Sequence, residues 1–274
     1  MKRTILVIGG TGGIGKAAAL ALAKQGNDFI IQGRDTEKGK SIVAEISKLN
    51  GSTATFIATD MHSVESIKDL AAEIKKLTTK IDIAIYSSGT LNSARKESKD
   101  GLDEGFLVNY LNKFMLDTLL LEELKRGEGR VIIVGAPLMK NAAINFDDLQ
   151  GKNNYALFKA MGQAMLAVHM HVQEFARRNG AHPSINVINP GVVKSGIDRN
   201  VTGPLKIMLR MFGPLISNSS EKAVVNIMEL ATTKNIESGY FYPKLAKPEA
   251  KTKVSLDAAT AAKLWDESLK LAKL

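Results

Sequence analysis

The sequence predicts an α/β protein of one domain, with helices on both faces of a doubly wound parallel sheet. Short runs rich in β-branched residues alternate along the chain with longer segments of helical spacing, which is typical of this class. The run Val131–Val134 is apolar throughout, as expected of a strand buried on both faces. With 274 residues, 45% of them hydrophobic, and no repeats, the chain suits a single core over residues 1–274.

The expected elements follow this alternation in chain order. Strands are predicted at Thr4–Ile8, Phe29–Gln32, Thr53–Ala58, Ile81–Ser87, Arg130–Val134 and Ser184–Ile188. Helices are predicted at Gly15–Gln25, Glu37–Leu49, Ser63–Leu77, Leu102–Arg126, Tyr155–Asn179 and 255–273. Residues 195–220 break the alternation, because two Gly-Pro pairs bracket an apolar and basic stretch there. That segment predicts a loop with a short helix.

Composition argues against several functional classes. The chain has no cysteine and its four histidines are scattered, so neither disulfides nor a metal site are expected. The net charge of +9 comes from basic residues spread along the chain, which favours anionic small ligands over nucleic acid. No apolar run approaches the ~20 residues of a membrane helix. The first apolar run is also too short for a signal peptide, so a cytoplasmic protein is expected.

A strand, a glycine-rich turn and a helix follow one another at the N-terminus. The turn Gly9–Gly15 reads Gly-Gly-Thr-Gly-Gly-Ile-Gly. Glycines let the backbone approach a pyrophosphate, and the helix N-terminus offers free N–H groups to it. The turn therefore predicts a dinucleotide site, with a plain tight turn between strand and helix as the alternative.

The end of the second strand indicates which dinucleotide binds. Enzymes that use NAD usually place a carboxylate here to accept hydrogen bonds from the ribose. This chain has Gly33, which removes that carboxylate, followed by Arg34, whose planar cation suits a 2′-phosphate. We therefore expect NADP(H). The alternative is that Arg34 pairs only with a surface acid such as Glu37, while Asp35 is expected to cap the following helix.

Tyr155 and Lys159 form a candidate proton-donating pair. Their four-residue spacing would place both side chains on one helix face. A free tyrosine has a pKa near 10, and a neighbouring ammonium lowers it by stabilising the phenolate. The pair therefore predicts an acid for the reduction of a carbonyl group.

These features, taken in order, resemble the short-chain dehydrogenase/reductase family, which has a Rossmann fold, over nearly the whole chain. The glycine spacing Gly9-x3-Gly13-x-Gly15 and the pair Tyr155-x3-Lys159 match its motifs. The segment Asn189–Ser195 is similar to the one that closes over the nicotinamide. Residues 148–151, 238–241 and 264–265 look most like the retinol dehydrogenase and WW-domain oxidoreductase branch.

The resemblance implies roles for individual residues. Asp60 would lie against the adenine, Lys159 would hold the nicotinamide ribose, and Asn109 would organise a water chain to Lys159. The catalytic residues would be Tyr155, Lys159 and Asn109, with no metal. The implied cofactor contacts are Gly9, Thr11, Gly12, Gly13, Ile14, Gly15, Arg34, Asp60, Met61, Ser88, Gly89, Tyr155, Lys159, Pro190, Gly191, Val193 and Ser195.

One departure from the family bears on the chemistry. Ala136 stands where a catalytic serine is expected, and an alanine cannot donate a hydrogen bond to a carbonyl oxygen. The loss of such a donor costs roughly 3 kcal/mol of transition-state stabilisation. Three explanations stay open. Ser87, Ser88 or Asn141 could substitute, the reaction could be at a C=C bond, or turnover could be lost with cofactor binding kept.

The expected function is an NADPH-dependent reductase of a lipophilic carbonyl compound, with Tyr155 as the proton donor. Apolar residues between Ile197 and Ile216 suit such a substrate. The alternatives are reduction of an activated C=C bond and a catalytically weak NADP(H)-binding protein. No integral membrane segment is expected, whereas contact with a membrane surface and a homodimer or homotetramer stay open. Met161, Met165 and Met170 are predicted to pack in the core.

Overall fold

The computed structural model describes residues 2–191, 193, 197–204, 206–207, 223–234, 236–243 and 256–274. Ser195 and most of the segment predicted at 195–220 lie outside these residues, so the proposed cofactor contact of Ser195 has no structural account.

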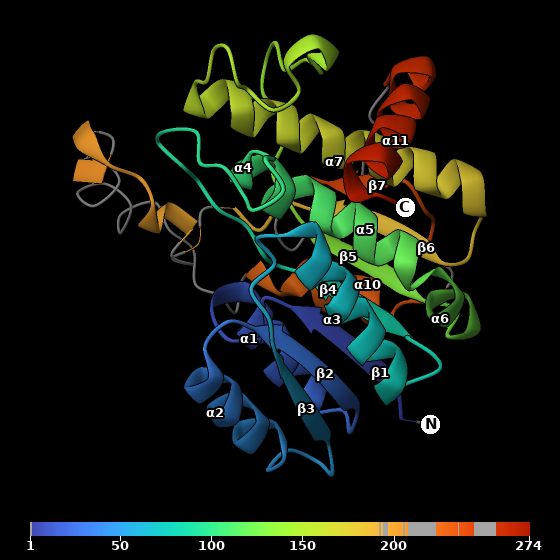
Figure 1. Ribbon diagram of the computed structural model, residues 1–274. Helices are drawn as coiled ribbons and strands as arrows, with labels where there is room; N and C mark the ends of the chain where they lie inside the picture. Colours follow the sequence, from blue (N-terminus) through green and yellow to red (C-terminus); the bar gives the residue numbers. More distant parts are fainter. Residues whose placement is uncertain are drawn as a thin grey trace.

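The core of the fold is a parallel sheet of seven strands, in the order β3-β2-β1-β4-β5-β6-β7 (Figure 1). The strands are β1 Thr4–Ile8, β2 Asp28–Gly33, β3 Thr53–Ala58, β4 Ile83–Tyr86, β5 Arg130–Val134, β6 Ser184–Ile188 and β7 Tyr240–Tyr242. The predicted fold class is confirmed. β7 was not among the predicted strands, because a run of three residues is too short to show a periodicity.

Helices cover both faces of this sheet (Figure 1). One face carries α1 Gly13–Ala23, α2 Thr36–Ile46 and α10 Val225–Thr232. The other carries α3 Val64–Leu77, α5 Asn112–Leu119 and α7 Leu157–Asn179. The last helix, α11 Ala258–Ala272, packs on α7, where Trp265 lies against His171 and Phe175.

The strand β1 illustrates why the sheet is buried on both sides. Ile5 and Val7 point into the layer of α1 and α2, whereas Leu6 and Ile8 point into the layer of α3 and α5. All four side chains are fully buried. Since the strands are parallel, their carboxyl ends meet at one edge of the sheet, and this edge is where the site forms.

The helix predicted at Leu102–Arg126 is divided into four segments by a π-helical turn and a bend. It consists of α4 Glu104–Phe106, a π-helical turn η1 Leu107–Leu111, α5, and α6 Leu121–Arg126 after a bend at Leu120. The π turn is marked by the amide of Asn112, which donates to the carbonyl of Leu107. A nearly continuous apolar run hides such a turn from periodicity, yet π turns are frequent at functional sites.

Candidate active site

A cleft of about 500 Å³ lies along the carboxyl ends of the strands. It spans the gap between β1 and β4, where the strand order reverses and where open α/β sheets bind ligands. Its lining includes most of the predicted cofactor contacts: Gly9, Thr11, Gly12, Gly13, Ile14, Arg34, Asp60, Met61, Ser88, Gly89, Pro190, Gly191 and Val193.

The glycine-rich turn forms one end of this cleft. Gly9 has a φ of +78°, a left-handed conformation that favours glycine. A Cβ atom on Gly15 would lie 2.5 Å from the carbonyl oxygen of Gly9, so Gly15 serves close packing and does not line the cleft. Gly12 caps α1 without a side-chain hydrogen bond and has open space around it. The first N–H groups of α1 are therefore accessible from the cleft.

A positively charged corner follows the end of β2. A Cβ atom on Gly33 would collide with Thr11, so a larger residue does not fit there. Arg34, Lys38 and Arg199 all line the cleft at this corner. Burial and the nearby Arg34 lower the pKa of Arg199, an effect that Asp60 partly offsets. Two guanidinium groups that repel each other across a cleft suit an anion between them.

The neighbouring acids Asp35 and Glu37 interact with groups other than Arg34. Glu37 forms its ion pair with Lys40 at 2.8 Å, and so the alternative pairing of Arg34 with Glu37 is wrong. Asp35 caps α2, as predicted, by accepting from the amide of Lys38 at 3.1 Å.

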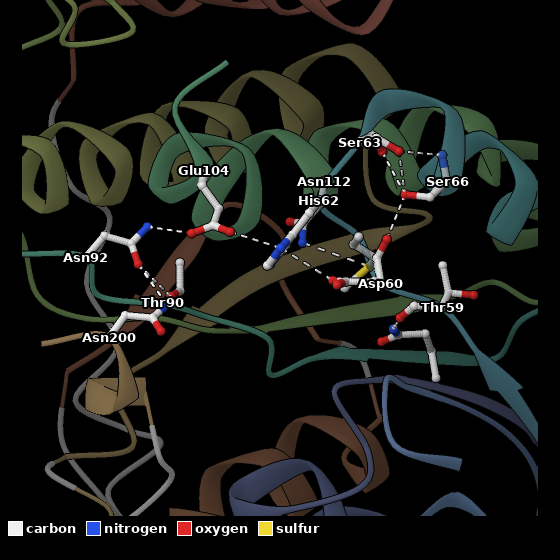
Figure 2. Close-up of polar contacts among 12 residues, drawn as sticks. Thr59, Asp60, His62, Ser63, Ser66, Thr90, Asn92, Glu104, Asn112 and Asn200 are labelled. Atoms are coloured by element: carbon white, nitrogen blue, oxygen red, sulfur yellow. Dashed lines mark hydrogen bonds and ion pairs between the residues drawn. The ribbon is translucent and has the colours of Figure 1, made fainter. Parts of the chain in front are cut away.

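A polar network joins the loops on one side of the cleft (Figure 2). Nδ1 of His62 lies 2.9 Å from Oε1 of Glu104, and the other oxygen of Glu104 accepts from Asn92. Nδ2 of Asn200 donates in turn to Asn92 at 2.9 Å and, more weakly, to Thr90 at 3.3 Å.

Backbone contacts strengthen this link. The amide of Leu91 donates to the carbonyl of Ile197 at 3.1 Å, and the amide of Thr202 donates to the hydroxyl of Ser93 at 2.9 Å. The segment 197–202 is therefore fastened to the loop after β4. Ile197 comes so close to Gly89 that a Cβ atom there would lie 3.1 Å from it.

Tyr155 and Lys159 do not line this cleft. They lie beside a separate small hollow together with Asp103, Asp148 and Gln150. The prediction that both side chains share one helix face is wrong, because Ala156 is extended and α7 begins only at Leu157. The four-residue spacing could not show where the helix begins.

The environment of Tyr155 also differs from the predicted one. Its hydroxyl donates to the carbonyl of Asn92 at 2.8 Å. Burial, together with the carboxylates of Asp103 and Glu104, raises the pKa of Tyr155 to about 12. The predicted lowering by Lys159, whose side chain is exposed, is thus wrong. Neither residue is placed to donate a proton or to hold a ribose in the cleft.

Asn109 lies in η1 and lines the cleft, as its predicted role requires. Its amide group is engaged on both sides, since Oδ1 accepts from the amide of Thr90 and Nδ2 donates to the Thr90 carbonyl, both at 2.8 Å. The lysine near this turn is Lys113, whose Nζ donates to the carbonyl of Val108 at 3.0 Å. A water chain from Asn109 to Lys159 is not supported, because Lys159 is outside the cleft.

The opposite end of the cleft is an apolar wall. Ala136 follows β5, and α7 presents Met161, Met165 and Val168 on the face that lines the cleft. Met170 is buried in the core and Met165 packs against it, as predicted, while Met165 also lines the cleft. Met161 lines the cleft and is not part of the core cluster. The four-residue spacing that the family uses for its tyrosine and lysine recurs at the cleft in these two methionines.

The three candidates for the missing donor beside Ala136 differ in placement. Ser87 lines the cleft but donates to the carbonyl of Ile8 at 2.9 Å, and so it has a structural partner. Ser88 lines the cleft, and its hydroxyl is 3.4 Å from Nδ2 of Asn112. Asn141 is exposed and does not line the cleft. Ser88 is the one of the three that could reach a ligand.

Several residues that line the cleft were not among the predicted site residues: His62, Thr90, Lys113, Met161, Met165, Arg199 and Asn200. The helical phase of Met161 with Met165 was a usable signal, because it differs from that of the neighbouring pair Tyr155 and Lys159. Among the described residues no cluster of three or more acidic, histidine or cysteine side chains could hold a metal ion. Over the same part of the chain, no helix combines the length and hydrophobicity of a membrane span.

Comparison with known proteins agrees with this architecture. The profile of the short chain dehydrogenase family matches residues 3–206. Retinol dehydrogenase 13 of Homo sapiens is 31% identical, with 99% of this chain and 85% of that protein covered. Polyprenol dehydrogenase of Homo sapiens is 29% identical, with 98% and 84% covered. A putative daunorubicin C-13 ketoreductase, DnrU, of Streptomyces sp. (strain C5) is 30% identical, with 97% and 91% covered.

Solved structures share the fold. The NADP active-site complex of Pseudomonas aeruginosa RhlG superposes with a TM-score of 0.68 at 25% identity, covering 90% of this chain and 96% of that one. The alcohol dehydrogenase of Thermococcus sibiricus with 5-hydroxy-NADP gives a TM-score of 0.69 at 16% identity, covering 93% and 100%. The chain therefore belongs to the short-chain dehydrogenase family, in the branch similar to the retinol dehydrogenases.

Proposed function

We propose that this chain is an NADP(H)-dependent oxidoreductase that reduces a lipophilic carbonyl compound. The observation that carries the proposal is a single cleft that joins a phosphate-binding turn and a cationic corner to an apolar wall. A dinucleotide with a 2′-phosphate fits the first two parts, and a lipophilic substrate fits the third. The names of the relatives, which refer to retinol, polyprenol and a ketoreductase, support the same class of substrate.

The residues present suit the dinucleotide. The free N–H groups of α1, from Gly13 onward, would hold the pyrophosphate, since Gly12 leaves the helix end open. Arg34 and Arg199 would hold the 2′-phosphate. Asp60 and Met61 would lie at the adenine. For the nicotinamide half, the proposed contacts are Ser88, Gly89, Pro190, Gly191 and Val193.

The bound dinucleotide would supply a hydride to the carbonyl carbon. The wall of Ala136, Met161 and Met165 would exclude water and adapt to an irregular apolar substrate, because methionine side chains are flexible and polarisable. Tyr155 is not retained as the proton donor, because it lies outside the cleft. The proton must come from another group of the cleft or from water.

A second candidate function is supported by the composition of that wall. Ala136, Met161 and Met165 offer no acidic proton to a substrate oxygen. A protein that binds NADP(H) with little turnover would have such a wall. Reduction of an activated C=C bond would also be compatible with a wall that lacks an acid, since the enolate formed in that reaction can be protonated by water.

The test combines binding with turnover on the purified chain. NADPH and NADH are titrated by nucleotide fluorescence, and the protein is then incubated with NADPH and a panel of lipophilic aldehydes, ketones and enones. Tight NADPH binding with an alcohol product supports the carbonyl reductase. A saturated ketone supports the alkene reaction, and binding without any product supports the second candidate. Absence of NADPH binding refutes the proposal.

A further inference from the structure

Lys113 is a buried cation that faces the cleft. Its side chain extends from the first turn of α5, directly after η1, and only 2% of the residue is exposed. It nevertheless lines the cleft beside Ser88 and Asn109. A lysine buried to this extent is rare unless it is paired or functional.

The partners of this ammonium group are all neutral. Nζ donates to the carbonyl oxygens of Val108 at 3.0 Å and Ser88 at 3.2 Å. A third contact, to Oδ1 of Asn112, is long at 3.4 Å. No ion pair of the described residues includes Lys113.

The nearest acid is already committed to other groups. Asp117, one turn further along α5, accepts from the hydroxyl of Tyr86 at 2.9 Å. Its other oxygen lies 2.7 Å from Nε2 of His171 on α7. Asp117 therefore attracts Lys113 through space without neutralising it by contact. Tyr86 of β4 and His171 of α7 thus face Lys113 through Asp117, and Asp60 and His62 line the cleft from the loop after β3.

We propose that Lys113 donates the proton to the substrate oxygen in this cleft, the role that the sequence suggested for Tyr155. The assignment rests on the proposed function as a carbonyl reductase. It follows from the place of Lys113 in the lining of the cleft, the absence of an acid in contact with its ammonium group, and the lack of an acidic proton on the wall of Ala136, Met161 and Met165. Nothing else in that part of the cleft combines these properties among the described residues.

The proposed step transfers one hydride and one proton to the substrate. As hydride reaches the carbonyl carbon, the π-electron pair of the C=O bond moves to oxygen, and that oxygen takes one proton from Nζ. The carbonyl is reduced by two electrons, the dinucleotide is oxidised by two, and the lysine is left as a neutral amine. A proton from solvent restores the ammonium. Burial lowers the pKa of Lys113 to about 7, partly offset by Asp117, and an acid with a pKa near the working pH transfers protons efficiently.

The first experiment measures the lysine itself, without any variant of reduced stability. The Nζ and Cε resonances of isotopically labelled lysine are titrated by NMR in the intact protein, with and without NADPH. The Lys113 signal is assigned by its absence from the spectrum of Lys113→Gln. A midpoint near pH 7 is expected for Lys113, whereas a midpoint near the ordinary ~10.4 overturns the proposal.

The second experiment separates proton transfer from cofactor binding. Lys113→Met is expected to lower kcat for carbonyl reduction by about 10²-fold or more, while the Kd for NADPH changes by less than about threefold. The wild-type rate is expected to fall as the pH rises through about 7, and this fall is expected to be absent from the variant. Lys125→Met, an exposed lysine on α6, is the matched control.

The outcomes distinguish this inference from the proposed function. If the wild type does not bind NADPH, both fail. If it binds NADPH without reducing any carbonyl, the proposed carbonyl reductase and the role of Lys113 fail together. If the wild type reduces a carbonyl and folded Lys113→Met keeps the wild-type kcat and pH profile, only the role of Lys113 fails. Loss of NADPH binding in Lys113→Met would instead make Lys113 a cofactor contact. If Lys113→Met does not fold, Lys113→Gln and the NMR midpoint decide.

Discussion

The two ends of the cleft differ in how closely their residues match the pattern of the family. At the end formed by β1 to β3, the glycine-rich turn, Arg34 and Asp60 line the cleft. At the end formed by β5 and α7, the expected serine, tyrosine and lysine are absent, and Ala136, Met161 and Met165 line the surface. One end therefore has free N–H groups and cations that suit an anion, whereas the wall of the other end has no acidic side chain.

The difference has a physical origin. The end with the glycine-rich turn is built from backbone N–H groups. It also contains glycines that pack so closely that a Cβ atom would collide with a neighbour, as at Gly15 and Gly33. The chemical end relies on a few side chains that protrude from a packed helix. A methionine can replace a tyrosine or a lysine on such a helix without changing the fold, because it packs well in irregular apolar gaps. Side chains at the β5 and α7 end can thus be replaced without altering the backbone of the glycine-rich turn.

The largest effect is expected from rebuilding the chemical end. In the triple variant Ala136→Ser, Met161→Tyr, Met165→Lys, the three new side chains would face the same cleft. In the background of Lys113→Met, which lacks the proposed proton donor, these three changes are expected to raise turnover of a simple ketone with NADPH by about 10²-fold, since a positioned general acid contributes 10²–10⁴-fold. Steady-state kinetics on one ketone and one enone measure the gain.

The single variant Ala136→Ser is the control for this experiment. In the same Lys113→Met background it is expected to change ketone turnover by less than about threefold, because a hydroxyl donor without a neighbouring acid supplies only part of the stabilisation. A large gain from Ala136→Ser alone would show that an acid is already present beside Ala136. If the folded triple variant shows no gain in ketone turnover, the residues of this wall do not limit the reaction.

The next largest effect is expected at the end of the cleft formed by β1 to β3. Arg34→Ala is expected to weaken NADPH binding by about 10- to 100-fold, because charge-assisted hydrogen bonds are worth roughly 1.5–3 kcal/mol. NADH binding should stay nearly constant, since NADH has no 2′-phosphate. Fluorescence titration of both nucleotides measures this. Lys40→Ala, which removes an equal charge from α2 outside the cleft, should change neither Kd, and equal losses in both variants would reduce the effect to net charge.

Much of the fold and of the cofactor end follows from the sequence. β1, β3, β5 and β6 have the predicted bounds, because each is a continuous apolar or β-branched run between turn residues. The chemical end could not be predicted in the same way. A four-residue spacing occurs at both Tyr155 and Met161, and only the start of α7 at Leu157 decides which pair faces the cleft. Lys113 looked like any helix lysine, since its burial depends on the π turn before it.

A smaller effect concerns stability at the chemical end. Burial lowers the pKa of Lys113 to about 7 in the folded protein, while the unfolded chain keeps about 10.4. Between these values the unfolded state binds more protons than the folded state, so the stability of the wild type relative to Lys113→Met should rise with pH. The wild type should gain a few degrees in Tm over the variant between about pH 6 and pH 10. Parallel Tm curves would mean that Lys113 stays charged in the fold.

The smallest effect is expected from Tyr155→Phe, and it bears directly on the comparison. The hydroxyl of Tyr155 donates to the carbonyl of Asn92 outside the cleft, so its removal should cost about 1 kcal/mol of stability. Turnover and NADPH affinity should stay within about twofold of the wild type, whereas a catalytic phenol would be worth 10²-fold or more. Kinetics and thermal unfolding of the same preparation measure both quantities. Loss of turnover with intact folding would show that Tyr155 takes part in the reaction. Both ends of the cleft would then match the pattern of the family.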